Sequence, residues 1–113
     1  MSEKEIADVY AMALRVLADN FCWDYRNWKH AQGEKEAHEK ELEILRKFLE
    51  KYGNALSEKE REKMEHRIEY AKDRIEEAEK AIKDYFNALV EDKKELERLL
   101  GEELLLEKVS GKG

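Results

Sequence analysis

Residues 64–89 read MEHRIEYAKDRIEEAEKAIKDYFNAL, and apolar residues recur in this stretch at alternating spacings of four and three. The rhythm continues beyond residue 89 with one polar interruption, at Asp92. The first half of the chain keeps the same rhythm from Tyr10 to Tyr52, with polar interruptions that include Asp24. Such heptads are typical of the seam of a coiled coil. The sequence therefore predicts an all-α protein built from two long amphipathic helices.

A short segment, Gly53-Asn54-Ala55-Leu56, separates the two apolar rows. Because so few residues can only turn the chain back on itself, the rows predict a long antiparallel, coiled-coil-like hairpin. Ser2 and Ser57 each begin an S-x-x-E capping box, which marks a helix start. We expect Gly53 and Gly101 to end the two helices in a left-handed conformation, which places the second helix over 58–100.

One antiparallel register aligns the two rows along their whole length. It pairs core residues as Leu42 with Ile68, Trp28 with Ile82, Phe21 with Leu89 and Leu14 with Leu96. Gly33 lies inside the first row and permits a break in the helix, at a cost of roughly 1 kcal/mol relative to Ala. The row keeps its phase across Gly33, which favours a continuous helix.

The pattern predicts a single domain over residues 1–113, with a slim stalk at about 34–80 and an aromatic head formed by about 3–31 with 82–109. In the head, many apolar residues lie off the seam: Ile6, Val9, Ala13, Val16, Ala18, Trp23, Tyr25, Phe86, Val90 and Leu100. A helix that is apolar on most sides requires burial on several sides. We expect a short C-terminal helical segment around 104–109 to cover part of this surface. We expect a second copy to cover the rest, giving a four-helix-bundle dimer.

The overall charge excludes several classes of protein. The chain has 22 basic and 28 acidic residues, a net charge of −6, and both signs are interspersed. A duplex DNA binder would show a basic face, so duplex nucleic acid is not an expected partner. The single cysteine, Cys22, excludes an internal disulfide and a thiolate metal cluster. No stretch resembles a signal peptide or a membrane span, and we expect a cytoplasmic protein without membrane contact.

The titratable residues do not form a pattern typical of an enzyme. The Glu-x-x-His motif of di-iron bundles is absent, and we expect no catalytic residues, metal ligands or cofactor. Asp24, Tyr85 and Asp92 are predicted polar residues of the seam. The register places Asp24 in the layer of Tyr85, and Asp92 opposite Leu17, roughly 10 Å away from Asp24 along the axis. These residues are expected to set the register or to line a small polar pocket.

The favoured function is a non-enzymatic helical protein-interaction module: a small adaptor, assembly factor or inhibitor that acts through its head and through self-association. The residues predicted to bind the partner or a second copy are Trp23, Tyr25, Arg26, Lys29, His30 and Leu105. Trp, Tyr and Arg are enriched at the energetically dominant positions of interfaces. Two alternatives remain: a bundle that binds a small ligand in a polar head pocket, and single-stranded nucleic-acid binding through the aromatic and basic cluster 21–30.

Overall fold

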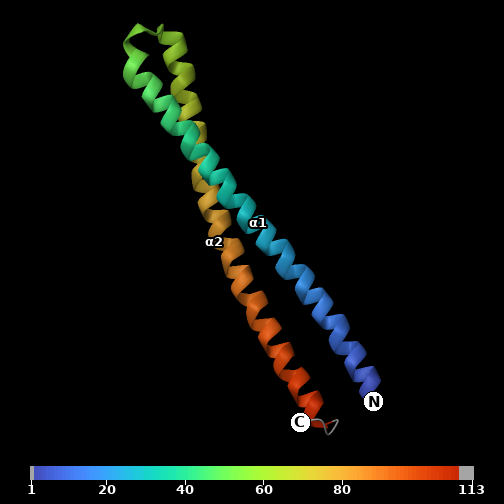
Figure 1. Ribbon diagram of the computed structural model, residues 1–113. Coiled ribbons are helices and arrows are strands. Elements are labelled where there is room, and N and C mark those ends of the chain that lie inside the picture. The colour runs from blue at the N-terminus through green and yellow to red at the C-terminus, as the bar shows by residue number, and fades with distance from the viewer. Residues whose placement is uncertain (1, 110–113) are drawn as a thin grey trace. The chain divides into compact units, whose positions relative to one another are not determined.

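The chain is an all-helical hairpin in the computed structural model, which describes the backbone of residues 2–109 and the side chains of residues 2–101. Helix α1 spans Glu3–Tyr52, and helix α2 spans Glu58–Val109. A one-turn 3-10 helix, η1 (Gly53–Ala55), joins them (Figure 1). The predicted all-α hairpin is confirmed. Neither helix, within the described residues, has an apolar window long enough to cross a bilayer.

Both helices begin at the predicted serines. The amide of Glu5 donates to Ser2 Oγ, and the amide of Glu60 donates to Ser57 Oγ, each over 3.2 Å. These hydrogen bonds satisfy one of the amide donors that every helix start leaves without an intrahelical partner. The two predicted helix starts are therefore confirmed.

The predicted left-handed conformation is wrong at both glycines, although α1 does end at Tyr52, directly before Gly53. Gly53 does not adopt a left-handed conformation; α1 instead tightens into η1, and the Arg61 guanidinium and the Leu56 amide donate to the Gly53 carbonyl. Because these donors satisfy a carbonyl at the helix end, no left-handed residue is needed. Helix α2 continues through Gly101 to Val109, so the expected C-terminal segment is the last part of α2 and not a separate helix.

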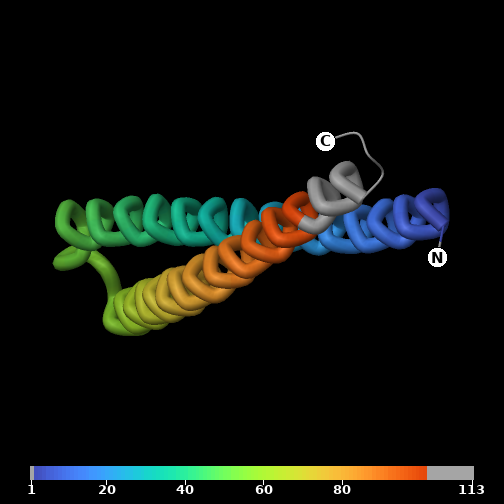
Figure 2. The backbone as a smooth tube through the Cα atoms, turned by 90° about the horizontal axis from the view of Figure 1, so that it is seen from below, coloured from blue at the N-terminus to red at the C-terminus, as the bar shows by residue number. Residues whose placement is uncertain are grey.

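Helix α1 is continuous through Gly33 (Figure 2). An added Cβ at Gly33 would meet no atom within 4 Å, so the glycine is not required by a close approach. The helical turns on both sides of Gly33 are well formed, and this long helix therefore tolerates one glycine.

The chain divides into two compact units, and each is described by itself. Unit 1 comprises Met1–Asn27 and Tyr85–Gly113, and unit 2 comprises Trp28–Asp84. The buried apolar residues of unit 2 lie on its two antiparallel helices, and all but one are alanines: Ala31, Leu42, Ala71 and Ala78. Two ion pairs join the helices of unit 2, Lys35 with Glu79 at 3.6 Å and Glu41 with Arg67. Unit 2 thus has a narrow seam closed by charged pairs at its edges.

In unit 1 the seam of α1 departs from the predicted one. Leu14 is 40% exposed, whereas Ala13 and Leu17 are half-buried, as are Ile6 and Tyr10. The physical reason is the mismatch between the 7-residue repeat and the 3.6-residue turn, which shifts a heptad position by about 20° per repeat in a straight helix. Because Leu14 lies four heptads before buried Leu42, the accumulated drift of roughly 80° carries it out of the seam.

Candidate interaction surface

Unit 1 buries few of its apolar side chains and exposes many of them. Leu89 is the only apolar residue of its described part that is buried. Its exposed large apolar side chains are Val9, Met12, Leu14, Val16, Trp23, Tyr25, Phe86, Val90 and Leu100. Single exposed apolar residues are ordinary, but several that gather on one face of a helix mark an interaction surface or an aggregation hazard.

Four of these side chains lie on one face of α1, where Asp19 takes the heptad position between Val16 and Trp23. Val9, Met12, Val16 and Trp23 are separated by three, four and seven residues, which places them on one face of a helix. They are 53%, 57%, 57% and 65% exposed. We call these four residues the α1 stripe. Its heptad spacing is that of a helix-packing seam, although no part of the described chain covers it.

A row of charged residues runs along one edge of the α1 stripe and enters it at Asp19, one heptad after Met12. Asp8, Arg15, Asp19 and Arg26 are separated by seven, four and seven residues, and all four are exposed. We call them the charged row. Within the described residues, none of the four makes an ion pair. The exposed charges of α2 in unit 1 are different, since Lys93 pairs with Glu97 at 3.9 Å and Lys94 with Glu91 at 3.4 Å.

The predicted partner-binding residues are divided between the two units. Trp23, Tyr25 and Arg26 are exposed and belong to unit 1, and the ring of Tyr25 stacks on that of Phe21 with centroids 6.3 Å apart. Trp23 belongs to the α1 stripe and Arg26 to the charged row.

Lys29 and His30 belong to unit 2. The Lys29 ammonium lies 5.1 Å from the centre of the Trp28 ring, and His30 approaches Glu34 at 3.6 Å. Both side chains are thus engaged with neighbours on their own helix. The side chain of Leu105 lies outside the described residues.

The carboxyl groups of Asp24 and Asp92 interact with each other, although the predicted register places the two residues in different layers. Side chains on a helix lean toward its N-terminus, and in antiparallel helices this brings together residues whose Cα atoms lie in different layers. The Asp92 Oδ2 atom is buried, and no N–H or O–H donor of the described residues reaches it. A hydrogen bond between two carboxyl groups requires that one of them carries a proton.

Burial raises the pKa of Asp92 to about 6, and the neighbouring Asp24 contributes to this shift by accepting the shared proton and by its charge. Tyr85, which the register places in the layer of Asp24, is half-buried and makes no hydrogen bond to Asp24 among the described residues. The carboxyl pair is therefore a polar contact inside the helix seam of unit 1.

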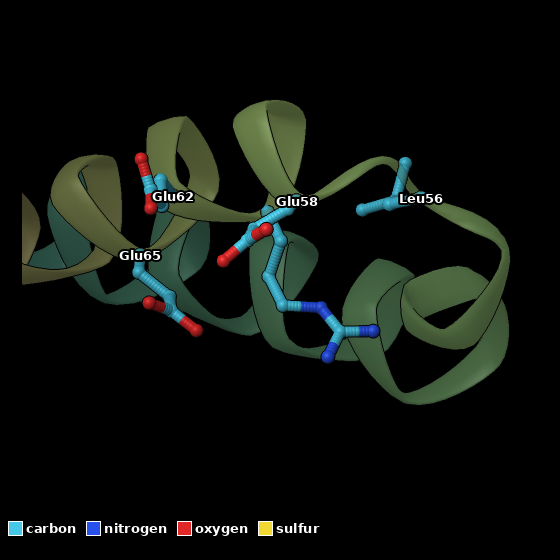
Figure 3. A pocket seen from close by; sticks show the side chains of 5 residues that line it. Leu56, Glu58, Glu62 and Glu65 are labelled. Carbon is cyan, nitrogen blue, oxygen red and sulfur yellow. The ribbon is translucent and has the colours of Figure 1, made fainter.

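Two shallow surface hollows lie in unit 2. One, at the start of α2, is lined by Leu56, Glu58, Arg61, Glu62 and Glu65 (Figure 3). Its one cation, Arg61, is already bound to the Gly53 carbonyl. The other lies beside Leu42 and Ile75 and has a largely charged rim. No group of three or more His, Cys, Asp or Glu side chains within the described residues is arranged to hold a metal ion.

Sequence reasoning missed Met12 and three members of the charged row. The signal was present in the sequence, because Met12 completes a heptad with Val9 and Val16, and the row repeats at helical spacings. A comparison of the chain with known protein families, curated proteins and solved structures finds no match.

Proposed function

We propose that the protein is a non-enzymatic helical protein-interaction module that acts as a homodimer assembled through unit 1. The observation that carries this proposal is the imbalance in unit 1 between one buried apolar residue and nine exposed large ones among its described side chains. Two helices have too few faces to bury such a set. A second copy supplies two further helices, and the pairing forms a four-helix head.

The total surface area supports the same proposal. The chain exposes 8899 Å². A compact monomer of this length exposes about 6,500 Å², which leaves an excess of roughly 2,400 Å². Each partner in a standard protein complex buries about 800 Å². The excess is thus ample for a stable dimer, and a small adaptor, assembly factor or inhibitor is the class of function that such a helical dimer suits.

Molar mass in solution tests the proposal. Sedimentation equilibrium or light scattering over a range of concentrations should give twice the mass of the chain. The variant Val16→Ser/Trp23→Ser removes two members of the α1 stripe and should shift the protein toward monomer by at least tenfold in Kd, because large apolar side chains dominate interface energies.

A matched control lies in unit 2. Ile44 is 67% exposed, at least as much as any member of the α1 stripe, and Ile44→Ser should leave the dimer unchanged. A wild-type protein that stays monomeric at every concentration, with its helix content intact, would contradict the proposal.

A further inference from the structure

The four residues of the charged row lie at equal distances on the two sides of Leu17 in the sequence. The two residues at each distance have opposite charges. Asp8 lies nine residues before Leu17, and Arg26 lies nine residues after it. Arg15 lies two residues before Leu17, and Asp19 lies two residues after it. Every acidic member thus has a basic counterpart at the same distance on the other side of Leu17.

Such a pattern complements itself when the helix pairs with a second copy that runs in the opposite direction. A two-fold axis at the level of Leu17 places Asp8 opposite Arg26 of the second copy, and Arg15 opposite Asp19 of the second copy. Each pair then occurs twice, as a two-fold interface requires. Parallel pairing would instead place the two charged rows at opposite edges of the contact, so that the charges of one row would not meet those of the other.

We infer that two copies of the chain associate through an antiparallel α1–α1 contact centred at Leu17, with the α1 stripe as its apolar seam and the charged row as its ionic border. This inference rests on the self-association proposed above and deepens it by assigning the contact face and the direction of the second copy.

The same register also aligns the apolar side chains. It brings Met12 of one copy to within one residue of the level of Trp23 in the other, so the largest side chain of the stripe packs beside an unbranched, adaptable one. Val16 lies beside the two-fold axis and meets its own equivalent. The apolar seam is interrupted once, at Asp19, which the same register places opposite Arg15 of the second copy.

The stripe is also placed so that a second α1 can dock without displacing α2. The α1 residues of the intrachain seam, such as Tyr10, Leu17 and Asp24, each follow a member of the stripe by one residue. One residue is about 100° around an α-helix. This is close to the right angle between the two neighbours of a helix in a four-helix arrangement, so both contacts coexist.

The unpaired state of the charged row is the second, independent observation. Exposed charges elsewhere in the described chain commonly pair along their own helix, as Glu36 does with Lys40 at 3.1 Å and Glu43 with Lys47 at 2.8 Å. The charged row has no such pairs within the described residues, although Arg15 and Asp19 are four residues apart and the row lies beside an uncovered apolar stripe. A complementary partner across an interface accounts for both features.

Charge reversal tests the inference in a single chain. We expect Arg26→Asp and Asp8→Arg each to weaken the dimer by about tenfold at low ionic strength, because each converts two attractive contacts of the dimer into repulsive ones. The double variant Asp8→Arg/Arg26→Asp restores both contacts with inverted polarity and should return the Kd to within about threefold of wild type. The single-variant effect should shrink in 1 M salt.

A control of equal charge change is available in unit 2. Lys40→Asp alters the net charge as Arg26→Asp does, and it lies on an exposed face away from the stripe. Its Kd should stay within about twofold of wild type. Circular dichroism of every variant should show unchanged helix content, since all the substituted residues are exposed.

Disulfide formation reports the direction of the second helix. In a Cys22→Ser background, Val16→Cys places two thiols beside the two-fold axis, and oxidation should yield a covalent dimer. Met12→Cys in the same background places them roughly 15 Å apart along the axis, which a disulfide cannot span. Parallel pairing would allow both variants to cross-link.

The outcomes separate this inference from the proposed function. A dimer whose Kd responds equally to Arg26→Asp and Lys40→Asp, a double variant that fails to restore association, or ready cross-linking of Met12→Cys would overturn the antiparallel contact and leave the dimer standing. A monomeric wild-type protein would overturn both.

Discussion

The carboxyl group of Asp92 meets the carboxyl group of Asp24 across the two helices of unit 1, and burial together with this neighbour raises the pKa of Asp92 to about 6. The ordinary value for an aspartate is near 3.9. Because the folded chain binds this proton more tightly than the unfolded chain does, the proton contributes stability that is fully present below about pH 4. This stability is lost as the pH rises through about 6.

Asp92→Asn should therefore stabilise the protein at neutral pH. The amide is uncharged at every pH and can donate a hydrogen bond to the Asp24 carboxylate. We expect the free energy of unfolding of wild type to fall by about 1–2 kcal/mol between pH 4 and pH 7 through this residue, and the variant to lack that part of the slope. Urea denaturation at fixed protein concentration and several pH values measures both quantities.

The control for this experiment is Asp84→Asn, which removes an exposed carboxylate of unit 2. It should leave the slope between pH 4 and pH 7 as in wild type. Equal slopes for wild type and Asp92→Asn would show that the carboxyl pair does not share a proton in the folded protein.

Gly33→Ala should raise the free energy of unfolding by about 1 kcal/mol. Gly33 is exposed inside α1, and an added methyl group would meet no atom within 4 Å, so only the conformational gain remains. Ala37→Gly, one turn later on the same exposed side, should lower it by a similar amount. Thermal melts followed by circular dichroism compare the three proteins, and destabilisation by Gly33→Ala would imply a hinge at this position.

The architecture was predictable because it follows from local rules that repeat along the chain. The apolar rhythm fixed the helix type, the S-x-x-E motifs at Ser2 and Ser57 fixed the helix starts, and the short connection required a hairpin. The continuation of α2 through Gly101 was not predictable. A glycine ends a helix only when the following residues cannot continue it, and here the residues up to Val109 are good helix formers.

The polar contacts of unit 1 required geometry that a register of Cα positions does not contain. A heptad count places Leu14 in the seam, but the drift of a straight helix removes it. The same count separates Asp24 from Asp92, but the lean of their side chains brings the carboxyl groups together. Heptad reading is accurate near the turn and loses accuracy with each repeat away from it.

Ser57→Ala should destabilise the protein by about 1 kcal/mol, because it leaves the Glu60 amide at the start of α2 without its side-chain acceptor. Ser57→Asp keeps an acceptor there and adds a favourable charge at the helix N-terminus, so it should match or exceed wild type. Ser2→Ala removes the equivalent hydrogen bond at the start of α1 and should also destabilise the protein. Chemical denaturation compares the three variants, and a Ser57→Ala variant as stable as wild type would contradict the prediction.

The ion pair between Glu41 and Arg67 should make an opposite contribution to the pH dependence. The hydrogen bonds from Arg67, one of which is 2.8 Å long, lower the pKa of Glu41 below its usual value. A lowered pKa stabilises the folded state above the ordinary pKa, near 4.3, and this contribution is lost as the pH falls through the lower folded value. Arg67→Gln should thus reduce the loss of unfolding free energy below about pH 4. Asp92→Asn should change the pH dependence of that free energy only above about pH 4.

A double-mutant cycle of Glu41→Gln and Arg67→Gln measures this ion pair directly. Because the Arg67 side chain is 49% exposed, the coupling free energy at pH 7 should be modest, about 0.5–1 kcal/mol, and it should decrease in 1 M salt. It should still exceed that of Glu36 with Lys40, whose side chains are more exposed and lie on a single helix. The Glu41–Arg67 pair connects the two helices of unit 2, so its loss removes a tertiary contact as well as a local charge pair. A coupling no larger than that of Glu36 with Lys40 would show that the pair does not hold the helices together.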